Sequence, residues 1–216
     1  MTELQRHTVV LADDHAMVRQ ALAQILEDSR EIRVVGQASD GASAIEVVEQ
    51  TRPELVVLDF SMPGMHASST IQQLLKRQPK LKILVLTVHE KIHYAVRVLE
   101  EGAHGYVVKS AAAHELLDAI RAVSQGEIYI SPKVSHKVIH ALRRPKRDRA
   151  GLEALSQREF DLLRLLGAGY SLSDCAAELD ISISAASTYR ARLLEKLNLK
   201  TTPEIIRFAL ENGIVG

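Results

Sequence analysis

The chain has 216 residues, of which 46% are hydrophobic and 25% charged, with 27 basic and 27 acidic side chains. This is the composition of a globular protein with one large or two small domains, and its single cysteine, Cys175, excludes an intramolecular disulfide framework and a cysteine-rich zinc site. No apolar run approaches the ~20 residues that span a bilayer, and we recognise no signal peptide, so we expect a cytoplasmic protein with no membrane partner.

Strands and helices alternate through the first 125 residues. Short apolar runs predict the strands, and apolar residues at helical spacing predict the helices. Five alternations predict a doubly wound parallel sheet, which is a (βα)5 flavodoxin-like α/β domain. The predicted strands are 8–12, 32–38, 55–58, 83–86 and 106–108, and the predicted helices are 15–27, 41–50, 68–77, 92–100 and 113–124.

The third predicted strand, Leu55 to Leu58, is a continuous apolar run that ends in Asp59. Such a run suits a strand covered on both faces, and open α/β sheets bind ligands outside the carboxyl ends of their strands. Because Met62-Pro63-Gly64 turns the chain away, we expect Asp59 to be presented rather than buried. Taken alone, the stretch also fits a strand-end aspartate that caps the next helix or turn.

Polar residues close three other predicted strands: Asp13-Asp14 the first, Thr87 the fourth and Lys109 the fifth. The carboxyl ends of parallel strands meet at one edge, so these side chains should converge with Asp59. Carboxylates that share a crevice repel one another and need a cation, and hard oxygen ligands suit Mg²⁺, which readily takes a phosphate. A surface lysine, a strand-end threonine and a capping aspartate are the ordinary alternatives, but four such residues at four strand ends favour a site.

This set of residues resembles the receiver domain of bacterial two-component response regulators. The matching residues are Asp13-Asp14, Asp59-Phe60-Ser61-Met62-Pro63, Thr87 and Gly102 through Lys109. The resemblance implies that Asp59 accepts a phosphoryl group from a sensor histidine kinase, with Mg²⁺ as cofactor. It assigns the metal to Asp13, Asp14, Asp59 and the backbone carbonyl of Ser61, and phosphoryl binding and switching to Thr87, Tyr106 and Lys109.

Two details of this domain bear on its geometry. Ala67 stands where the family usually has Gly in a turn, which costs energy if that turn needs a positive φ. His66, His89 and His93 have the spacing of no common zinc motif, so we interpret them as surface loop residues. By the resemblance, His89 also borders the site and influences how long the phosphoryl group lasts.

The charge becomes strongly basic after the fifth helix. Residues 1–130 carry 13 Lys and Arg against 17 Asp and Glu, residues 131–150 carry 7 against 1, and residues 151–216 carry 7 against 9. A helix is predicted from Pro132 to Leu142, and Arg143-Arg144-Pro145-Lys146-Arg147-Asp148-Arg149 then has the composition of a linker. A solvated tether is the commoner interpretation, and a segment near a polyanion is the alternative.

Four short helices are predicted from about Leu152 onward. Ser156 and Glu159 form a capping box for the first, Ser171 and Ser182 cap the second and third, and Pro203 opens the fourth. Any small all-α bundle fits this pattern, and a helix, tight turn and second helix is also the layout of a DNA-reading helix-turn-helix.

The third of these helices, residues 183–197, carries a different kind of side chain on each face. An apolar stripe faces the core, and another face has small polar residues with arginine beside them, as a helix in the major groove needs. The candidate base or groove contacts are Ser184, Ser187, Thr188 and Ala191. The candidates for phosphate contacts or surface salt bridges are Arg190, Arg192 and Lys196.

Residues 152–213 resemble the LuxR/FixJ-type output domain. The resemblance is carried by Leu155 to Glu159, Gly169, Ala176, Leu179, Ile181-Ser182 and Ser187 through Leu197. With the first resemblance it identifies a NarL/FixJ-type response regulator with a receiver (1–125), a helical and basic linker (126–151) and a DNA-binding domain (152–216). The family implies a homodimer on activation, bound to double-stranded promoter DNA. It implies a dimer face at Ile205, Ile206, Phe208 and Ala209, for which intradomain core is an equal alternative.

Two rival functions remain open on the sequence. A phosphatase or phosphotransferase would use Asp59 as a nucleophile, but the second acid of haloacid-type phosphatases is missing, since Ser61 stands two residues after Asp59. A DNA-binding regulator that works without phosphorylation is the other rival, which the intact acidic set disfavours.

Overall fold

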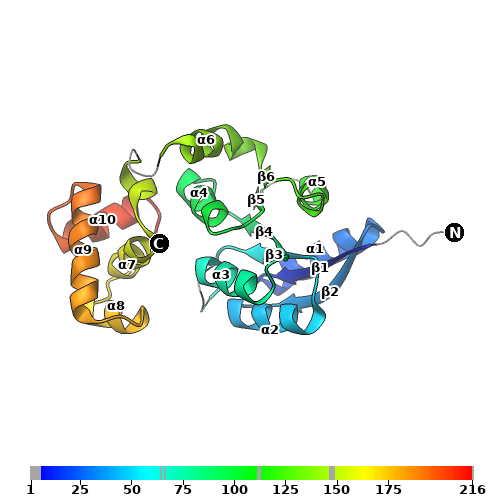
Figure 1. Cartoon of the computed structure of the whole chain (residues 1–216), viewed down its shortest axis with the longest axis horizontal. Coiled ribbons are helices and arrows are strands. Elements are labelled where there is room, and N and C mark those ends of the chain that lie inside the picture. Colours follow the sequence, from blue (N-terminus) through cyan, green and yellow to red (C-terminus); the bar gives the residue numbers. More distant parts are fainter. Residues whose placement is uncertain (1–5, 64, 66, 111–112, 146–148, 216) are drawn as a thin grey trace. The chain divides into compact units, whose positions relative to one another are not determined.

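The structure is a computed structural model that describes residues 6–63, 65, 67–110, 113–145 and 149–215. The chain divides into two compact units between Leu142 and Arg143 (Figure 1). Gly64 of the predicted turn, His66, and Lys146-Arg147-Asp148 of the predicted linker lie outside the described residues. Within the described part, no helix is both long and apolar enough to cross a membrane.

The first unit is built on a parallel sheet with the strand order β2-β1-β3-β4-β5-β6, which confirms the predicted doubly wound fold. Parallel pairing runs through every neighbouring pair of strands. The central strands are apolar because helices cover both of their faces. The strands are β1 (His7–Ala12), β2 (Ile32–Ala38), β3 (Leu55–Asp59), β4 (Lys82–Thr87), β5 (Gly105–Val108) and β6 (Tyr129–Ile130).

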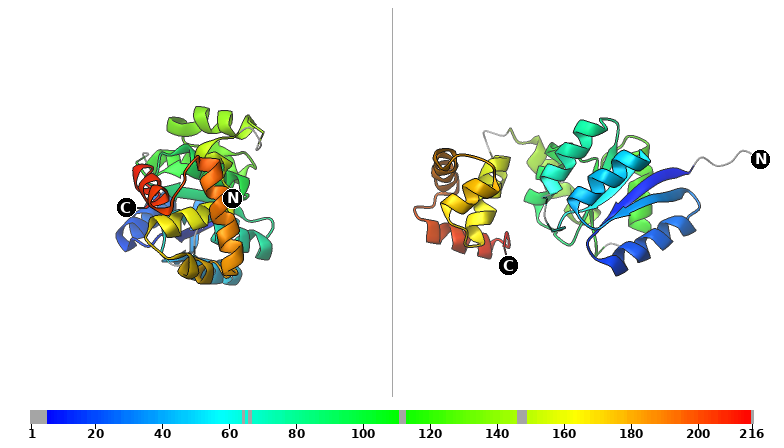
Figure 2. Two further views of the ribbon diagram at one scale, coloured as in Figure 1. Left: turned by 90° about the vertical axis from the view of Figure 1, so that its left-hand side faces the viewer. Right: turned by 90° about the horizontal axis from the view of Figure 1, so that it is seen from below.

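Helices lie on both sides of this sheet (Figures 1 and 2). Helices α1 (Ala16–Asp28) and α5 (Ala113–Ser124) share one side, where Leu26 and Ile120 are fully buried with Val9 and Leu84 of the strands. Helices α2 (Gly41–Thr51), α3 (Ala67–Arg77) and α4 (Ile92–Glu100) follow one another on the other side. This two-sided covering leaves the carboxyl edge of the sheet for polar side chains.

Ala67 is the first residue of α3, and no positive φ is recorded for it. The strain considered for this position therefore does not arise. Gly102 follows α4 with φ +103°, the left-handed value expected just after a helix end.

The chain after α5 belongs to the first unit, which differs from the predicted division at residue 125. Strand β6 pairs with β5, and Ser131 donates its backbone N–H to the Tyr106 carbonyl. Helix α6 (Pro132–Arg143) follows, with Val134 and Val138 buried. A two-residue strand is too short to give a periodic pattern, so the sequence pattern could not reveal this attachment.

The second unit contains the four predicted helices, preceded by a short 3-10 turn at Gly151–Ala154. The capping boxes of Ser156 with Glu159 and of Ser171 with Asp174 form as their sequences dictate. Asp180, at φ +51°, makes the sharp turn between α8 and α9. The helices are α7 (Gln157–Gly167), α8 (Leu172–Glu178), α9 (Ile183–Leu197) and α10 (Thr202–Glu211).

Candidate functional site

Lys109 joins the ends of three strands. Its ammonium group lies 2.7 Å from Asp13 Oδ2, just after β1, and 2.7 Å from Asp59 Oδ2, at the end of β3. Both carboxylates are buried, with side chains 3% and 2% exposed. Burial alone would lower the pKa of Lys109, but its hydrogen bonds to Asp13 and Asp59 raise the pKa above the ordinary lysine value.

This arrangement corrects the expectation that Asp59 would be presented to solvent. Asp59 does end its strand, but the Lys109 side chain from β5 bonds to its carboxylate, which is buried. Its other oxygen accepts a hydrogen bond from the Ser61 N–H at 3.2 Å. A turn after the strand fixes where the chain goes, but it does not determine which side chain of another strand covers the carboxylate.

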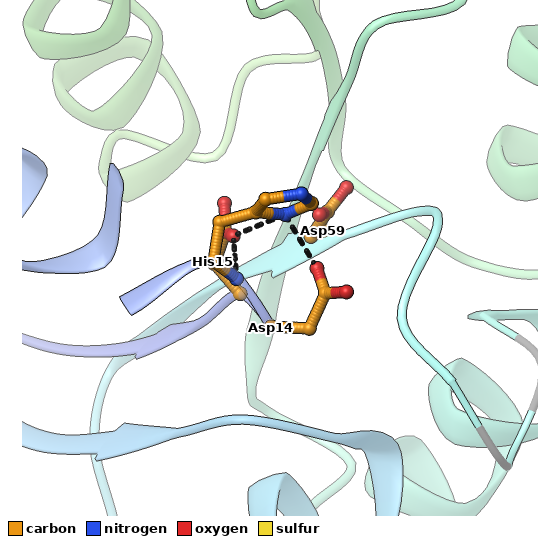
Figure 3. A group of neighbouring side chains, drawn as sticks. Asp14, His15 and Asp59 are labelled. Carbon is orange, nitrogen blue, oxygen red and sulfur yellow. Dashed lines mark hydrogen bonds and ion pairs between the residues drawn. The ribbon is translucent and has the colours of Figure 1, made fainter. Parts of the chain in front are cut away.

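The carboxylates of Asp13, Asp14 and Asp59 lie together with the ring of His15, so that one ligand atom from each falls within 4.8 Å of the others. His15 Nδ1 is 2.8 Å from Asp14 Oδ1, and Figure 3 shows the two side chains side by side near Asp59. His15 is predicted only as the start of a helix, but its position directly after Asp13-Asp14 in the sequence is a signal for this site. Three carboxylates and an imidazole form a donor set that fits a divalent cation.

Thr87 and Tyr106 are fully buried beside this site. The Thr87 hydroxyl oxygen accepts the His89 N–H at 3.0 Å, and the Tyr106 hydroxyl donates to the His89 carbonyl at 2.8 Å. Burial raises the pKa of Tyr106 far above its usual value, and a side-chain hydrogen bond with Thr87 only partly offsets this rise. The backbone of His89 is therefore bonded to both Thr87 and Tyr106, two of the three residues predicted to bind the phosphoryl group and to switch.

Of the two described histidines that we expected in surface loops, His89 does lie in the loop between β4 and α4 but is half-buried, whereas His93 lies in a helix. The His89 ring contacts the rings of Phe60 and Tyr94 and lies 3.4 Å from the Ser61 hydroxyl. Burial lowers the pKa of His89. His93 lies in helix α4. Among the residues that the structure describes, neither belongs to a group of potential metal ligands.

Helix α9 presents the predicted reading face to solvent. Ala186 and Leu193 are buried on the core side. The side chains on the opposite face are exposed, namely Ser184, Ser187, Thr188, Ala191 and Arg192. The Ser182 side chain accepts the Ala185 N–H and so fixes the residue at which α9 begins.

The side chains of the other two basic candidates of α9 form hydrogen bonds with residues of the same unit. Arg190 is half-buried and donates from Nε to the Thr202 hydroxyl at 3.0 Å. Lys196 lies 2.7 Å from Glu159 Oε2 and 3.0 Å from the Ala154 carbonyl. For Lys196 the salt-bridge alternative is therefore the one observed.

Glu159→Gln should lower the free energy of unfolding of the second unit by about 1–2 kcal/mol, through loss of a buried charge-assisted hydrogen bond. Burial would raise the pKa of Glu159, but hydrogen bonds from Lys196 and Ser156 hold it below its ordinary value of 4.5. The stabilisation is therefore present above that value and disappears as the pH falls through the lowered pKa.

Urea unfolding followed by circular dichroism at pH 7 and at pH 3–4 checks this. Glu211→Gln is the matched control, because Glu211 pairs with Arg207 at 3.8 Å and both side chains are more than 60% exposed. Equal effects of the two substitutions at pH 7 would contradict the prediction.

The predicted dimer face on α10 is only partly exposed. Ile205 and Ala209 are completely buried, so for these two residues the intradomain alternative replaces the dimer face. A side chain on Gly167 of α7 would lie 2.5 Å from the Ala209 methyl group, which shows how closely the two helices pack. Ile206 and Phe208 are half-buried.

Comparison with known proteins agrees with both parts of the chain. Residues 9–121 match the family model "Response regulator receiver domain", and residues 153–209 match "Bacterial regulatory proteins, luxR family". The chain is 33% identical to oxygen regulatory protein NreC of Staphylococcus carnosus over 96% of this chain and 98% of NreC. It is 31% identical to response regulator GacA of Pseudomonas aeruginosa over 96% and 97% of the two chains.

Solved structures of RcsB resemble the whole chain. RcsB of Salmonella typhimurium, described for its conformational dynamism in DNA interaction, matches with a TM-score of 0.74 and 25% identity over 95% of this chain and 98% of RcsB. RcsB bound to the promoter P1flhDC with the phosphomimetic BeF3⁻ matches with a TM-score of 0.74 and 26% identity over 97% and 98%.

Proposed function

Because this chain belongs to the two-component response regulators with a LuxR-type output domain, we propose that phosphorylation of Asp59 controls its dimerisation and its binding to promoter DNA. A sensor histidine kinase is the proposed phosphodonor. The observation that carries the proposal is the buried cluster of Asp59, Asp13 and Lys109 in the same chain as an exposed reading helix.

The residues around Asp59 are suited to accept a phosphoryl group. One Asp59 oxygen attacks phosphorus, the bond to the leaving group breaks, and the product is an acyl phosphate. Lys109 moves from the carboxylate to the new phosphoryl oxygens, which carry more charge. Mg²⁺ is the proposed cofactor, held by Asp13, Asp14, Asp59 and the Ser61 carbonyl, and when bound it would neutralise phosphoryl charge.

The switch that we propose runs through His89. Its backbone bonds to both Thr87 and Tyr106, so a Thr87 hydroxyl that turns to a phosphoryl oxygen releases the His89 N–H. That release shifts the segment that leads into α4. In this proposal Asp59 receives a phosphoryl group as a regulatory signal and does not serve the turnover of a phosphatase. The similarity to regulatory proteins supports this choice.

The DNA contacts that we propose lie on α9. Ser184, Ser187, Thr188 and Ala191 read base edges in the major groove, and Arg192 contacts a phosphate. Structures of RcsB dimers on DNA support a dimer that binds two half-sites. Ile206 and Phe208 remain the candidates for contacts between output domains.

The test is selection from random-sequence duplex DNA, followed by gel shift with and without acetyl phosphate and Mg²⁺, for the wild type and Asp59→Asn. We expect the phosphodonor to tighten binding to an enriched two-half-site sequence about tenfold or more in the wild type alone, as a coupling of 1.4 kcal/mol or more gives. If both proteins bind equally and ignore the donor, the chain is a phosphorylation-independent regulator.

A further inference from the structure

We propose that the basic face of α6 and the adjoining linker binds the sugar–phosphate backbone of the DNA that the output domain reads. We define the basic face by His136, Lys137, His140, Arg143 and Arg144, all of which are exposed. This inference rests on the proposed function, since it adds a second contact to the same DNA.

The basic face is one continuous stripe. At 100° per residue, positions 136, 137, 140 and 143 fall on one side of the helix, while Val134, Val138 and Ala141 are buried on the other, and Arg144 follows directly after the helix end. The stripe is about 12 Å long at 1.5 Å per residue. One strand of B-DNA has one charge per ~3.4 Å of axis, so a stripe of this length spans about three phosphates of one strand.

Within the part of the chain that the structure describes, no acidic side chain compensates the positive charge of this face. The sequence contains no acidic residue from Pro132 to Pro145. Lys133 pairs with Glu90 at 3.2 Å and is therefore left out of the face. Lys137, Arg143 and Arg144 form no ion pair with any residue that the structure describes.

The helix dipole does not account for the whole stripe. Basic residues stabilise the last turn of a helix, which covers His140 and Arg143. His136 and Lys137 lie nearer the middle of α6, beyond the range of that effect. A partner that carries regularly spaced negative charge accounts for all five positions.

The output unit itself carries no net positive charge. Residues 151–216 carry 7 basic and 9 acidic side chains. On α9, Arg190 and Lys196 are held by Thr202 and Glu159, which leaves Arg192 exposed on the reading face. Since phosphate contacts contribute a large share of the affinity of many DNA-binding proteins, basic residues from another part of the chain would strengthen binding by this unit.

The chain length allows this contact. Gly151, where the output unit's first turn begins, is eight residue steps after Arg143, and at up to ~3.6 Å per step these span at most about 29 Å. This is less than one turn of DNA, about 34 Å. The end of α6 can therefore lie at most about 29 Å from the first turn of the output unit.

The test is the salt dependence of DNA binding by the full chain. Binding to the enriched two-half-site duplex is measured by fluorescence anisotropy between about 50 and 200 mM NaCl, a range over which phosphate contacts dominate. In the variant Lys137→Gln/Arg143→Gln we expect the slope of log K against log salt to become less negative by about 1.8, which is 0.9 for each lost phosphate contact. The control Arg33→Gln/Lys80→Gln removes one arginine and one lysine that are exposed elsewhere on the first unit and should leave the slope unchanged.

The outcomes separate this inference from the proposed function. If the wild type binds the duplex and the α6 variant has the control's slope, the inference is wrong and the proposed function stands; the basic face then belongs to another polyanion, such as an acidic protein. If the wild type binds no DNA, both fail. Circular dichroism of each variant verifies that it is folded.

Discussion

Asp59→Asn will abolish incorporation of phosphate from acetyl phosphate. The amide that replaces the carboxylate cannot form an acyl phosphate, and the substitution also removes one of the two anions that hold Lys109. Intact-protein mass spectrometry, before and after treatment with hydroxylamine, which cleaves acyl phosphates, should show a labile adduct in the wild type. In Asp59→Asn the adduct should fall to background.

Asp13 is the necessary comparison, because its surroundings are almost the same. It is as buried as Asp59, it also bonds to Lys109 at 2.7 Å, and its second oxygen accepts a backbone N–H, from His15. Asp13→Asn should slow labelling but leave it detectable, since the acceptor remains. Asp118→Asn, which removes an exposed carboxylate of α5, should change nothing. A labile adduct that survives in Asp59→Asn and is lost in Asp13→Asn would reverse the two roles.

Lys109→Met should lower the free energy of unfolding by about 3 kcal/mol at pH 7 without divalent metal, because two buried carboxylates lose their cation. Mg²⁺ should restore most of this loss. A ligand that binds only the folded state at 100 times its dissociation constant adds about 2.7 kcal/mol. Urea unfolding in EDTA and in MgCl₂ measures both effects.

The pH dependence of this effect follows from the raised pKa of Lys109. A folded-state pKa above the ordinary value of 10.5 means that the ion pairs stabilise the fold at all pH values below 10.5. The difference between wild type and Lys109→Met should therefore stay level from pH 7 to about 10 and shrink above it. Lys133→Met is the control, because its pair with Glu90 is more than half exposed and should contribute under about 1 kcal/mol. If Lys109→Met lowers the free energy of unfolding by the same amount in EDTA and in MgCl₂, the result would argue against a cation site.

The sequence predicted the alternation of strands and helices, and with it the edge where the site lies. Apolar runs are visible in a single sequence because burial on both faces demands them. The ends of β1, β3, β4 and β5 then follow from topology. The helix starts at Ser156 and Ser182 were predictable for a similar reason, since a capping side chain bonds within a few residues of itself.

The sequence did not determine the contacts between residues that lie far apart along the chain. Lys109 bonds to a residue 96 positions away, and Lys196 to one 37 positions away, and neither spacing is periodic. The burial of Asp59, the two bonds of His89 and the core position of Ile205 depend on such contacts. Local patterns limit the choice of partners, and packing decides among them.

Strand β6 also prevents β5 from being an open sheet edge that could pair with a strand of another copy of the chain. The Tyr129 N–H of β6 donates to the His104 carbonyl and the Ser131 N–H donates to the Tyr106 carbonyl, so β6 covers the outer side of β5. A receiver cut at residue 125 would expose these backbone groups along an apolar strand, which is the kind of free edge that recruits another strand and aggregates. The natural place to separate the two units is therefore after α6, where the edge stays covered.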